Sequence, residues 1–153
     1  MVTMRGVVFF SLICLVLIFS INPALGEKPG AEIKAIQVKL KVQSITKENF
    51  YMGDVWVAPP KFSDAQAGKT YIGYARAFGL DELGSTIDLS PVWEPGDPAM
   101  LEVSPKQGHE VKLTVLKAGQ SYLTVTAGGI SKKMAIKASS EGAVMNVEIS
   151  PSP

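Results

Sequence analysis

The sequence predicts an all-β protein, a sandwich of about seven to nine antiparallel strands. Three observations lead to this prediction. Short runs alternate apolar and polar residues, most regularly between Val92 and Ala138. Turn residues, chiefly Pro and Gly, separate these runs at roughly ten-residue intervals. Nowhere after residue 26 do apolar residues recur with the period of a helix, so almost no helix is expected there.

The N-terminal segment has the composition of a secretory signal peptide. Residues 7–21 carry no charge and follow Arg5, and Ala24-Leu25-Gly26 places small residues where a signal peptidase cuts. We therefore expect cleavage after residue 26 and a secreted, periplasmic or cell-surface protein. A retained membrane anchor is the alternative, although the run is shorter than the roughly 20 residues that span a bilayer. The membrane is then a partner only through this segment, if it is not cleaved.

The rest of the chain is electrically balanced. Arg5 is the only charged residue of the first 26, which leaves 14 basic residues, one fewer than the 15 of the whole chain, against 14 acidic ones. Scattered lysines on a neutral chain form no basic patch, so no nucleic acid partner is expected. The single cysteine, Cys14, lies in the signal segment. An exported domain without disulfides favours a bacterial envelope and must be stabilised by its core.

The first predicted strands follow residues 27–35, whose polar, Pro- and Gly-containing composition predicts a flexible leader. Residues 36–42 alternate apolar and polar side chains, which predicts a strand with a basic outer face. Because lysines protect sheet edges, we interpret residues 36–45 as a candidate edge strand that could accept a partner strand. A short strand over 55–57 ends at Pro59-Pro60, since proline lacks the N–H that a strand ladder needs.

The remaining strands are separated by turn signals. In the predicted strand 70–78, Ile72, Tyr74 and Phe78 share one face, and small residues form the other, which another layer could approach closely. Further strands are predicted over residues 87–93, 100–103, 111–115, 123–127, 134–138 and 145–149. Residues 36–149 are therefore expected to form one domain, followed by a tail at 150–153.

Part of this pattern resembles a known family, the bacterial immunoglobulin-like domain, group 2. The resemblance covers approximately residues 54–138, and its most specific part is the K-A-G segment. The matching residues are Gly68-Lys69-Thr70, Asp81-Glu82-Leu83-Gly84, Trp93 with Asp97-Pro98, Leu101-Glu102-Val103-Ser104, and Lys117-Ala118-Gly119 through Thr124-Val125-Thr126 before Gly128-Gly129. The family usually occurs as tandem copies, whereas one copy is found here. The resemblance implies an immunoglobulin-like β-sandwich that serves as a surface or periplasmic binding or spacer module, without catalytic residues.

Loop carboxylates are candidate calcium ligands. Asp81, Asp88 and Asp97, with Glu82 and Glu94 nearby, lie on either side of one predicted strand, and calcium prefers oxygen ligands on loops. Their spacing matches no EF-hand, and acidic residues are ordinary in turns. We therefore favour a protein with no metal and no cofactor.

Catalytic residues are scarce in the sequence. His109 is the only histidine, and its Gly-His-Glu turn predicts an exposed side chain. One histidine and no cysteine after residue 26 disfavour a zinc site. The sequence contains no G-x-S-x-G, H-E-x-x-H or glycine-rich phosphate motif. We therefore predict that the protein is not an enzyme.

Aromatic residues could build either a core or a platform on which sugars stack. The five residues considered are Trp56, Tyr71, Tyr74, Trp93 and Tyr122. Trp93 is assigned to the core by analogy with the buried tryptophan of immunoglobulin domains. Trp56, in an apolar run, is placed either in the core or on an interface. The candidate binding residues are Trp56, Tyr74, Glu94 and Asp97.

We expect an exported, non-catalytic module of the bacterial cell envelope that binds or spaces a partner protein or glycan. A sheet face or the loops 79–88 and 94–98 would make the contact. One alternative is a secreted protease inhibitor that presents the loop 94–98. A small envelope enzyme is a further, less favoured alternative.

Overall fold

The computed structural model describes residues 32–42, 46–47, 50–51 and 54–152. The expected signal peptide, residues 27–31 of the expected leader and Pro153 lie outside these ranges. The described residues form strands, turns and loops, and none of them is helical, as the sequence predicts. Accordingly, no helix that could cross a membrane occurs in this part of the chain.

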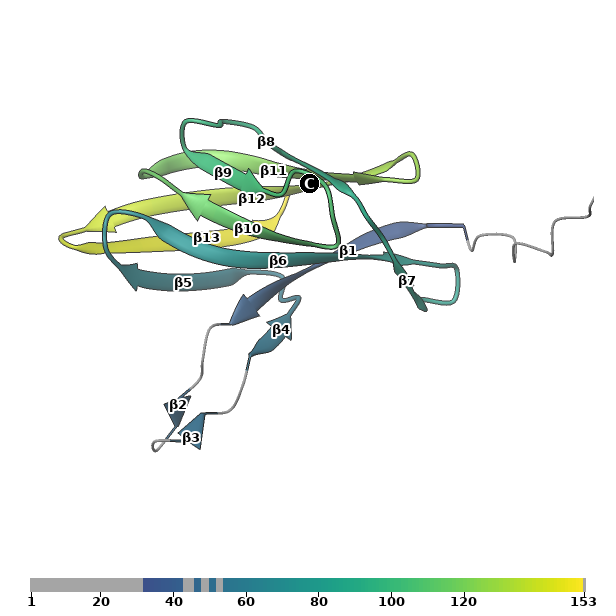
Figure 1. Ribbon diagram of the computed structural model, residues 1–153, viewed down its shortest axis with the longest axis horizontal. Coiled ribbons are helices and arrows are strands. Elements are labelled where there is room, and N and C mark those ends of the chain that lie inside the picture. Colours follow the sequence, from purple (N-terminus) through teal and green to yellow (C-terminus); the bar gives the residue numbers. More distant parts are fainter. Residues whose placement is uncertain (1–31, 43–45, 48–49, 52–53, 153) are drawn as a thin grey trace, which may run out of the picture. The chain divides into compact units, whose positions relative to one another are not determined.

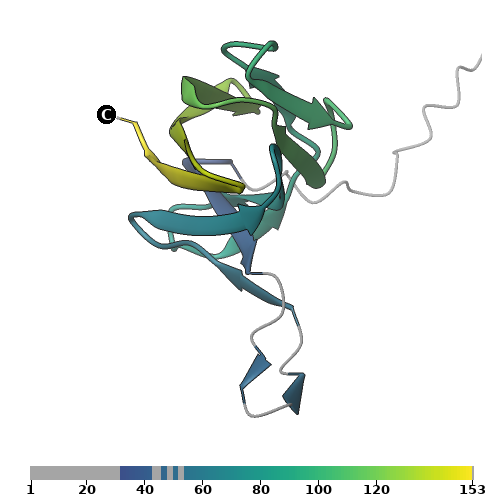
Figure 2. The same ribbon diagram turned by 90° about the vertical axis from the view of Figure 1, so that its left-hand side faces the viewer.

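Two antiparallel sheets of six and five strands form a sandwich (Figures 1 and 2). The six-stranded sheet has the order β4 (Val55–Val57), β1 (Ala35–Val42), β6 (Tyr71–Leu80), β10 (Glu110–Val115) and β9 (Leu101–Ser104), with β7 (Thr86–Asp88) paired to the end of β6. The five-stranded sheet has the order β5 (Phe62–Ala67), β13 (Val144–Pro151), β12 (Ile130–Glu141), β11 (Gly119–Ala127) and β8 (Val92–Pro95). The short strands β2 (Thr46–Lys47) and β3 (Phe50–Tyr51) pair with each other as a separate hairpin.

The core lies between the two sheets and is built from alternate residues of each strand. On β6 the inner face carries Tyr71 and then small residues down to Gly79, so the predicted small-residue face is the buried one. Small side chains let the opposite sheet approach closely. On β8, Trp93 is fully buried, and its Nε1 donates a hydrogen bond to the Gly108 carbonyl at 2.8 Å. This confirms the assignment of Trp93 to the core.

The segment before β1 contacts both sheets. The backbone N–H of Lys34 donates to the Leu80 carbonyl at 2.8 Å. The Ile33 side chain lies against Gly79 of β6 and against Gly128, which is in the turn between β11 and β12. A Cβ atom at Gly128 would fall 2.8 Å from Cδ1 of Ile33. The two glycines therefore make room for an isoleucine that bridges the sandwich at one end.

The prediction that residues 36–45 form an edge strand is wrong for the described part of this segment. β1 pairs with β6 over Ala35–Leu40 and with β4 over Leu40–Val42. The chain returns after the β2–β3 hairpin and places β4 beside β1. The strands at the two ends of each sheet are instead β4 and β9 in the six-stranded sheet and β5 and β8 in the five-stranded sheet.

Two other strand predictions also need correction. Residues 87–93 do not form one strand, because β7 belongs to the six-stranded sheet and β8 to the five-stranded sheet. The buried Pro91 lies between them, and proline cannot donate to a ladder. β5 was not predicted, since Phe62–Ala67 is largely polar. It becomes a strand by pairing with β13 over six residues, a long-range contact that the local sequence does not show.

Candidate binding site

The carboxylates considered for calcium do not come together. Oδ1 of Asp81 accepts hydrogen bonds from two backbone N–H groups of its own turn, both at 2.8 Å. Oδ1 of Asp97 accepts one from the N–H two residues ahead at 2.9 Å, and Asp88 is an exposed residue at the end of β7. Within the described ranges, no group of three or more His, Cys, Asp or Glu side chains is placed to hold a metal ion. Asp81 and Asp97 therefore stabilise turns.

The two segments expected to be loops are loops only in part. Segment 79–88 begins in β6 and ends in β7. In segment 94–98, Glu94 and Pro95 belong to β8 and pair with β11. Gly96 N donates to the Tyr122 carbonyl at 2.8 Å, and Asp97 N donates to Oγ of the buried Ser121 at 3.0 Å. Segment 94–98 therefore follows the sheet, and the prediction of one continuous loop is wrong.

His109 is half-buried, so the prediction of an exposed side chain is wrong. Its ring meets Phe78 edge-on, with 4.7 Å between centroids. The His109 carbonyl accepts a hydrogen bond from Ala77 N at 3.2 Å, which draws the turn onto the sheet. The imidazole Nδ1 is buried and has no hydrogen-bond partner among the described residues. This geometry provides no acidic residue that could orient the ring as a catalytic base.

Trp56 and Tyr74, two of the predicted binding residues, come together on the outer face of the six-stranded sheet. Trp56 pairs with Lys41 across β4 and β1, and Lys41 Nζ lies 5.2 Å from the ring centroid of Tyr74. Arg76 Cζ lies 4.1 Å from the centroid of Trp56. Nearby, Lys39 Nζ lies 4.8 Å from the centroid of Phe78. We call these six residues the cation–aromatic face.

The rings of the cation–aromatic face are already engaged. A cation covers one side of each ring, an attraction of about 0.5–1 kcal/mol at exposed sites. Glu110 holds Arg76 with contacts of 2.7 and 2.8 Å, and Asp54 forms an ion pair with Lys41. A sugar ring could stack only on the opposite side of each aromatic ring. The cation–aromatic face is therefore a poor sugar platform.

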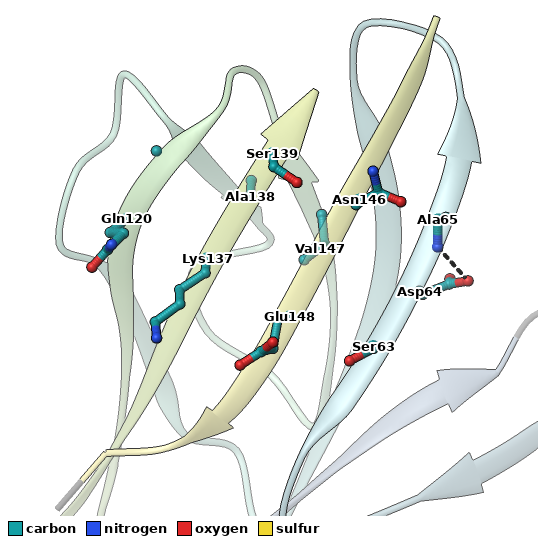
Figure 3. A pocket seen from close by; sticks show the side chains of 11 residues that line it. Ser63, Asp64, Ala65, Gln120, Lys137, Ala138, Ser139, Asn146, Val147 and Glu148 are labelled. Atoms are coloured by element: carbon teal, nitrogen blue, oxygen red, sulfur yellow. Dashed lines mark hydrogen bonds between the residues drawn. The ribbon is translucent and has the colours of Figure 1, made fainter. Parts of the chain in front are cut away.

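A polar groove of about 680 Å³ lies on the outer face of the five-stranded sheet (Figure 3). Cross-strand register places Gln120, Lys137, Glu148 and Ser63 in one row across β11, β12, β13 and β5. A second row, two residues along each strand, contains Ser139, Asn146 and Ala65. Directly opposed residues in such rows have Cβ atoms about 5 Å apart. The two rows therefore present amide, hydroxyl and charged groups at regular spacing.

Much of the hydrogen-bonding capacity of the polar groove is unused by the protein. Glu148 forms an ion pair with Lys61 at 2.6 Å. Among the described residues, Gln120, Lys137 and Asn146 make no side-chain hydrogen bond or ion pair. An amide group both donates and accepts hydrogen bonds, and an ammonium group donates three. The groove can therefore satisfy several polar groups of one ligand.

Tyr122 lies beside the polar groove, two residues along β11 from Gln120, and is 48% exposed. Lys133 Nζ lies 3.7 Å from its ring centroid. Gly96 packs against the ring so closely that a Cβ atom there would fall 2.7 Å from Cδ2 of Tyr122. Tyr122 and Asp97 line a smaller hollow of about 170 Å³ that shares Gln120 and Lys137 with the groove. Asp97, a predicted binding residue, is thus next to the groove.

The polar groove was missed as a site by the sequence analysis. Alternation indicated that residues such as Lys137 and Glu148 face outward. It did not indicate that β5, β13, β12 and β11 are adjacent, because this order depends on pairings between distant segments. Glu94, the fourth predicted binding residue, lines a different groove between β8 and β9.

Comparison of the chain with protein-family models, with curated proteins and with solved structures finds no match. The resemblance to the group 2 domain stays a prediction that rests on the quoted residues.

Proposed function

We propose that this chain is an exported, non-catalytic module of the bacterial cell envelope and that its polar groove binds a glycan. The observation that carries the proposal is the row Gln120–Lys137–Glu148–Ser63 with the second polar row beside it. Sugar hydroxyl groups both donate and accept hydrogen bonds, which matches side chains of these types. The volume of the groove lies within the range of small-molecule sites.

Export and envelope location are supported by the composition of residues 1–26 and by the resemblance to bacterial surface modules. A non-catalytic role is supported by His109, whose ring packs on Phe78 with a buried Nδ1. A protease inhibitor has less support, because Glu94 and Pro95 are strand residues paired with β11. A role as a spacer needs no groove and remains compatible with the sandwich.

The proposal is tested by measuring binding to immobilised oligosaccharides, with peptidoglycan fragments and neutral hexose oligomers as the two probe classes. We expect Lys137→Ala and Gln120→Ala each to lower the affinity for the retained sugar about tenfold. A loss of this size corresponds to one hydrogen bond to a charged or buried group. Lys112→Ala, an exposed lysine on β10 of the other sheet, is the matched control and should bind normally. Retention of no sugar, or equal loss with Lys112→Ala, would rule out the groove.

A further inference from the structure

One side of the sandwich is open between the edge strands β8 and β9. A groove of about 720 Å³ lies there, and we call it the edge groove. Its lining includes the buried Trp93, Leu101 and Val103 and the exposed Val92, Glu94 and Glu102. The apolar side chains of this lining are buried, with Trp93 and Leu101 at 0% and Val103 at 7% exposed.

The backbone of β8 is closed to a new strand. Trp93 N donates to the Lys106 carbonyl at 2.8 Å, and Gly108 N donates to the Pro91 carbonyl at 3.1 Å. Pro95, at the end of β8, has no N–H to offer. Prolines and covering loops are common ways of protecting a sheet edge. An added strand would have to pair with β9.

The backbone of β9 is open. Leu116 N donates to the Met100 carbonyl at 2.8 Å, and Leu101 is paired with Val115. Because hydrogen-bonded and non-bonded pairs alternate in an antiparallel ladder, the backbone groups of Leu101 and Val103 point away from β10. The N–H of Leu101 already donates a hydrogen bond to the Asp97 carbonyl at 2.9 Å. The Val103 N–H and the carbonyls of Leu101 and Val103 are left facing the edge groove.

The side chains around the edge groove specify what such a strand would carry. Residues opposite each other in a ladder share a face, so residues added opposite Leu101 and Val103 would point inward toward Trp93. A residue opposite Glu102 would point outward. Neither Glu94 nor Glu102 makes an ion pair within the described chain, so the groove has two unpaired carboxylates against one basic lining residue, the exposed Lys106. Apolar residues that flank a basic residue therefore match the groove.

We propose that the edge groove takes up an extended segment of a partner protein, which adds to the sheet as a strand beside β9 and alternates apolar with basic residues. A second copy is a poor occupant, because pairing β9 with β9 would bring two Glu102 side chains near each other, and like charges across a ladder destabilise it. The partner strand makes up to three backbone hydrogen bonds with Leu101 and Val103. This interaction is separate from glycan binding on the outer face of the five-stranded sheet.

The test uses the purified protein and two synthetic peptides, one alternating valine with lysine and one alternating valine with glutamate. Hydrogen exchange of individual amides is followed by NMR. The valine–lysine peptide should slow exchange of the Val103 amide and leave the Lys137 amide unchanged. The valine–glutamate peptide should have little effect. No protection of Val103 by either peptide, or equal protection by both, would overturn the proposal.

A charge reversal separates strand addition from nonspecific attraction. Glu102→Lys should lower the affinity for the valine–lysine peptide about fivefold, which corresponds to one exposed ion pair. The same change should raise the affinity for the valine–glutamate peptide. Glu141→Lys, an exposed glutamate at the end of β12, is the matched control and should change neither affinity. A dimer whose Val103 amide is protected without peptide would assign the edge groove to a second copy and contradict the proposal.

Discussion

At the scale of single residues, Tyr71 shows how burial and an internal partner act together. Tyr71 opens β6, is almost completely buried, and donates its hydroxyl to Asp64 Oδ2 at 3.0 Å. Asp64 belongs to β5, so this hydrogen bond links the two sheets. Burial, and then the charge of Asp64, raises the pKa of Tyr71 well above its ordinary value. The folded protein therefore holds the phenol proton more tightly than the unfolded chain does.

This difference predicts an alkaline loss of stability. Below a pH of about 10 the phenol is protonated in both states, and the stabilisation is fully present. As pH rises further, the unfolded chain loses the proton first, so the free energy of unfolding falls by up to about 1.4 kcal/mol per pH unit. We expect Tyr71→Phe to be less stable at neutral pH by about 1 kcal/mol and to lose less stability above pH 10. Urea unfolding of both proteins at neutral pH and above pH 10 measures these differences. An equal loss of stability with pH in the two proteins would contradict the prediction.

Some residue-level properties could be predicted from the sequence and others could not. The burial of Trp93 could be predicted because it stands in an alternating apolar run, and by analogy with the buried tryptophan of immunoglobulin domains. The half-buried state of His109 could not, because it depends on Phe78, 31 positions away in the sequence but adjacent in space. The cation on Tyr74 likewise comes from the neighbouring strand β1, and the cation on Trp56 comes from β6, two strands away.

At the scale of elements, the hairpin between β11 and β12 follows from its two glycines. Gly128 and Gly129 both have positive φ, 56° and 78°, which is the geometry of the favoured two-residue hairpin turn. Nothing lies within 4 Å of a Cβ atom built at Gly129, so substitution there tests the backbone alone. The pair Gly-Gly was a sufficient signal in the sequence.

We expect Gly129→Ala to lower the free energy of unfolding by about 1 kcal/mol, because an L-residue is strained at positive φ. Gly129→Asn should cost less, since asparagine tolerates this region better than alanine. Chemical denaturation of the three proteins gives the order directly. Equal stability of the glycine and alanine forms would show that the turn adapts.

β5 marks the limit of prediction at this scale. Gln66 of β5 accepts a hydrogen bond from Ile72 N at 2.8 Å and donates one to the Ile72 carbonyl at 2.7 Å. The glutamine side chain thus connects an edge strand of one sheet to β6 of the other. The polar sequence of Phe62–Ala67 predicts neither this contact nor the pairing with β13.

At the scale of the whole molecule, alternation and turn spacing were enough to predict a sandwich, but not which strands are neighbours. Both grooves depend on which strands lie next to each other. The polar groove needs β5 beside β13, and the edge groove needs β8 and β9 to end their sheets on the same side. Local sequence fixes neither pairing, since strand order is set by long-range packing.

Ile33 affects the whole molecule because it touches both sheets. We expect Ile33→Ala to reduce the free energy of unfolding by about 1–2 kcal/mol, less than for a fully buried isoleucine because Ile33 is half-buried. Lys34→Ala, next to it, removes only exposed ion pairs with Glu32 and Glu82 and should change the stability much less than Ile33→Ala does. Thermal unfolding compares the two variants. Equal effects would mean that Ile33 does not join the sheets.

The two faces of β6 also set how this protein can diverge over evolutionary time. The inner face is built from residues that cannot grow: Ala75 and Ala77 are fully buried, and a Cβ atom at Gly79 would meet Ile33 and Leu89 at 3.3 Å. The outer residues between them, Arg76 and Phe78, are only half-buried and make their contacts on the sheet surface, where a change of size can be accommodated by neighbouring side chains. Sequences descended from a common ancestor should therefore drift at every second position of this strand, while the positions between stay small.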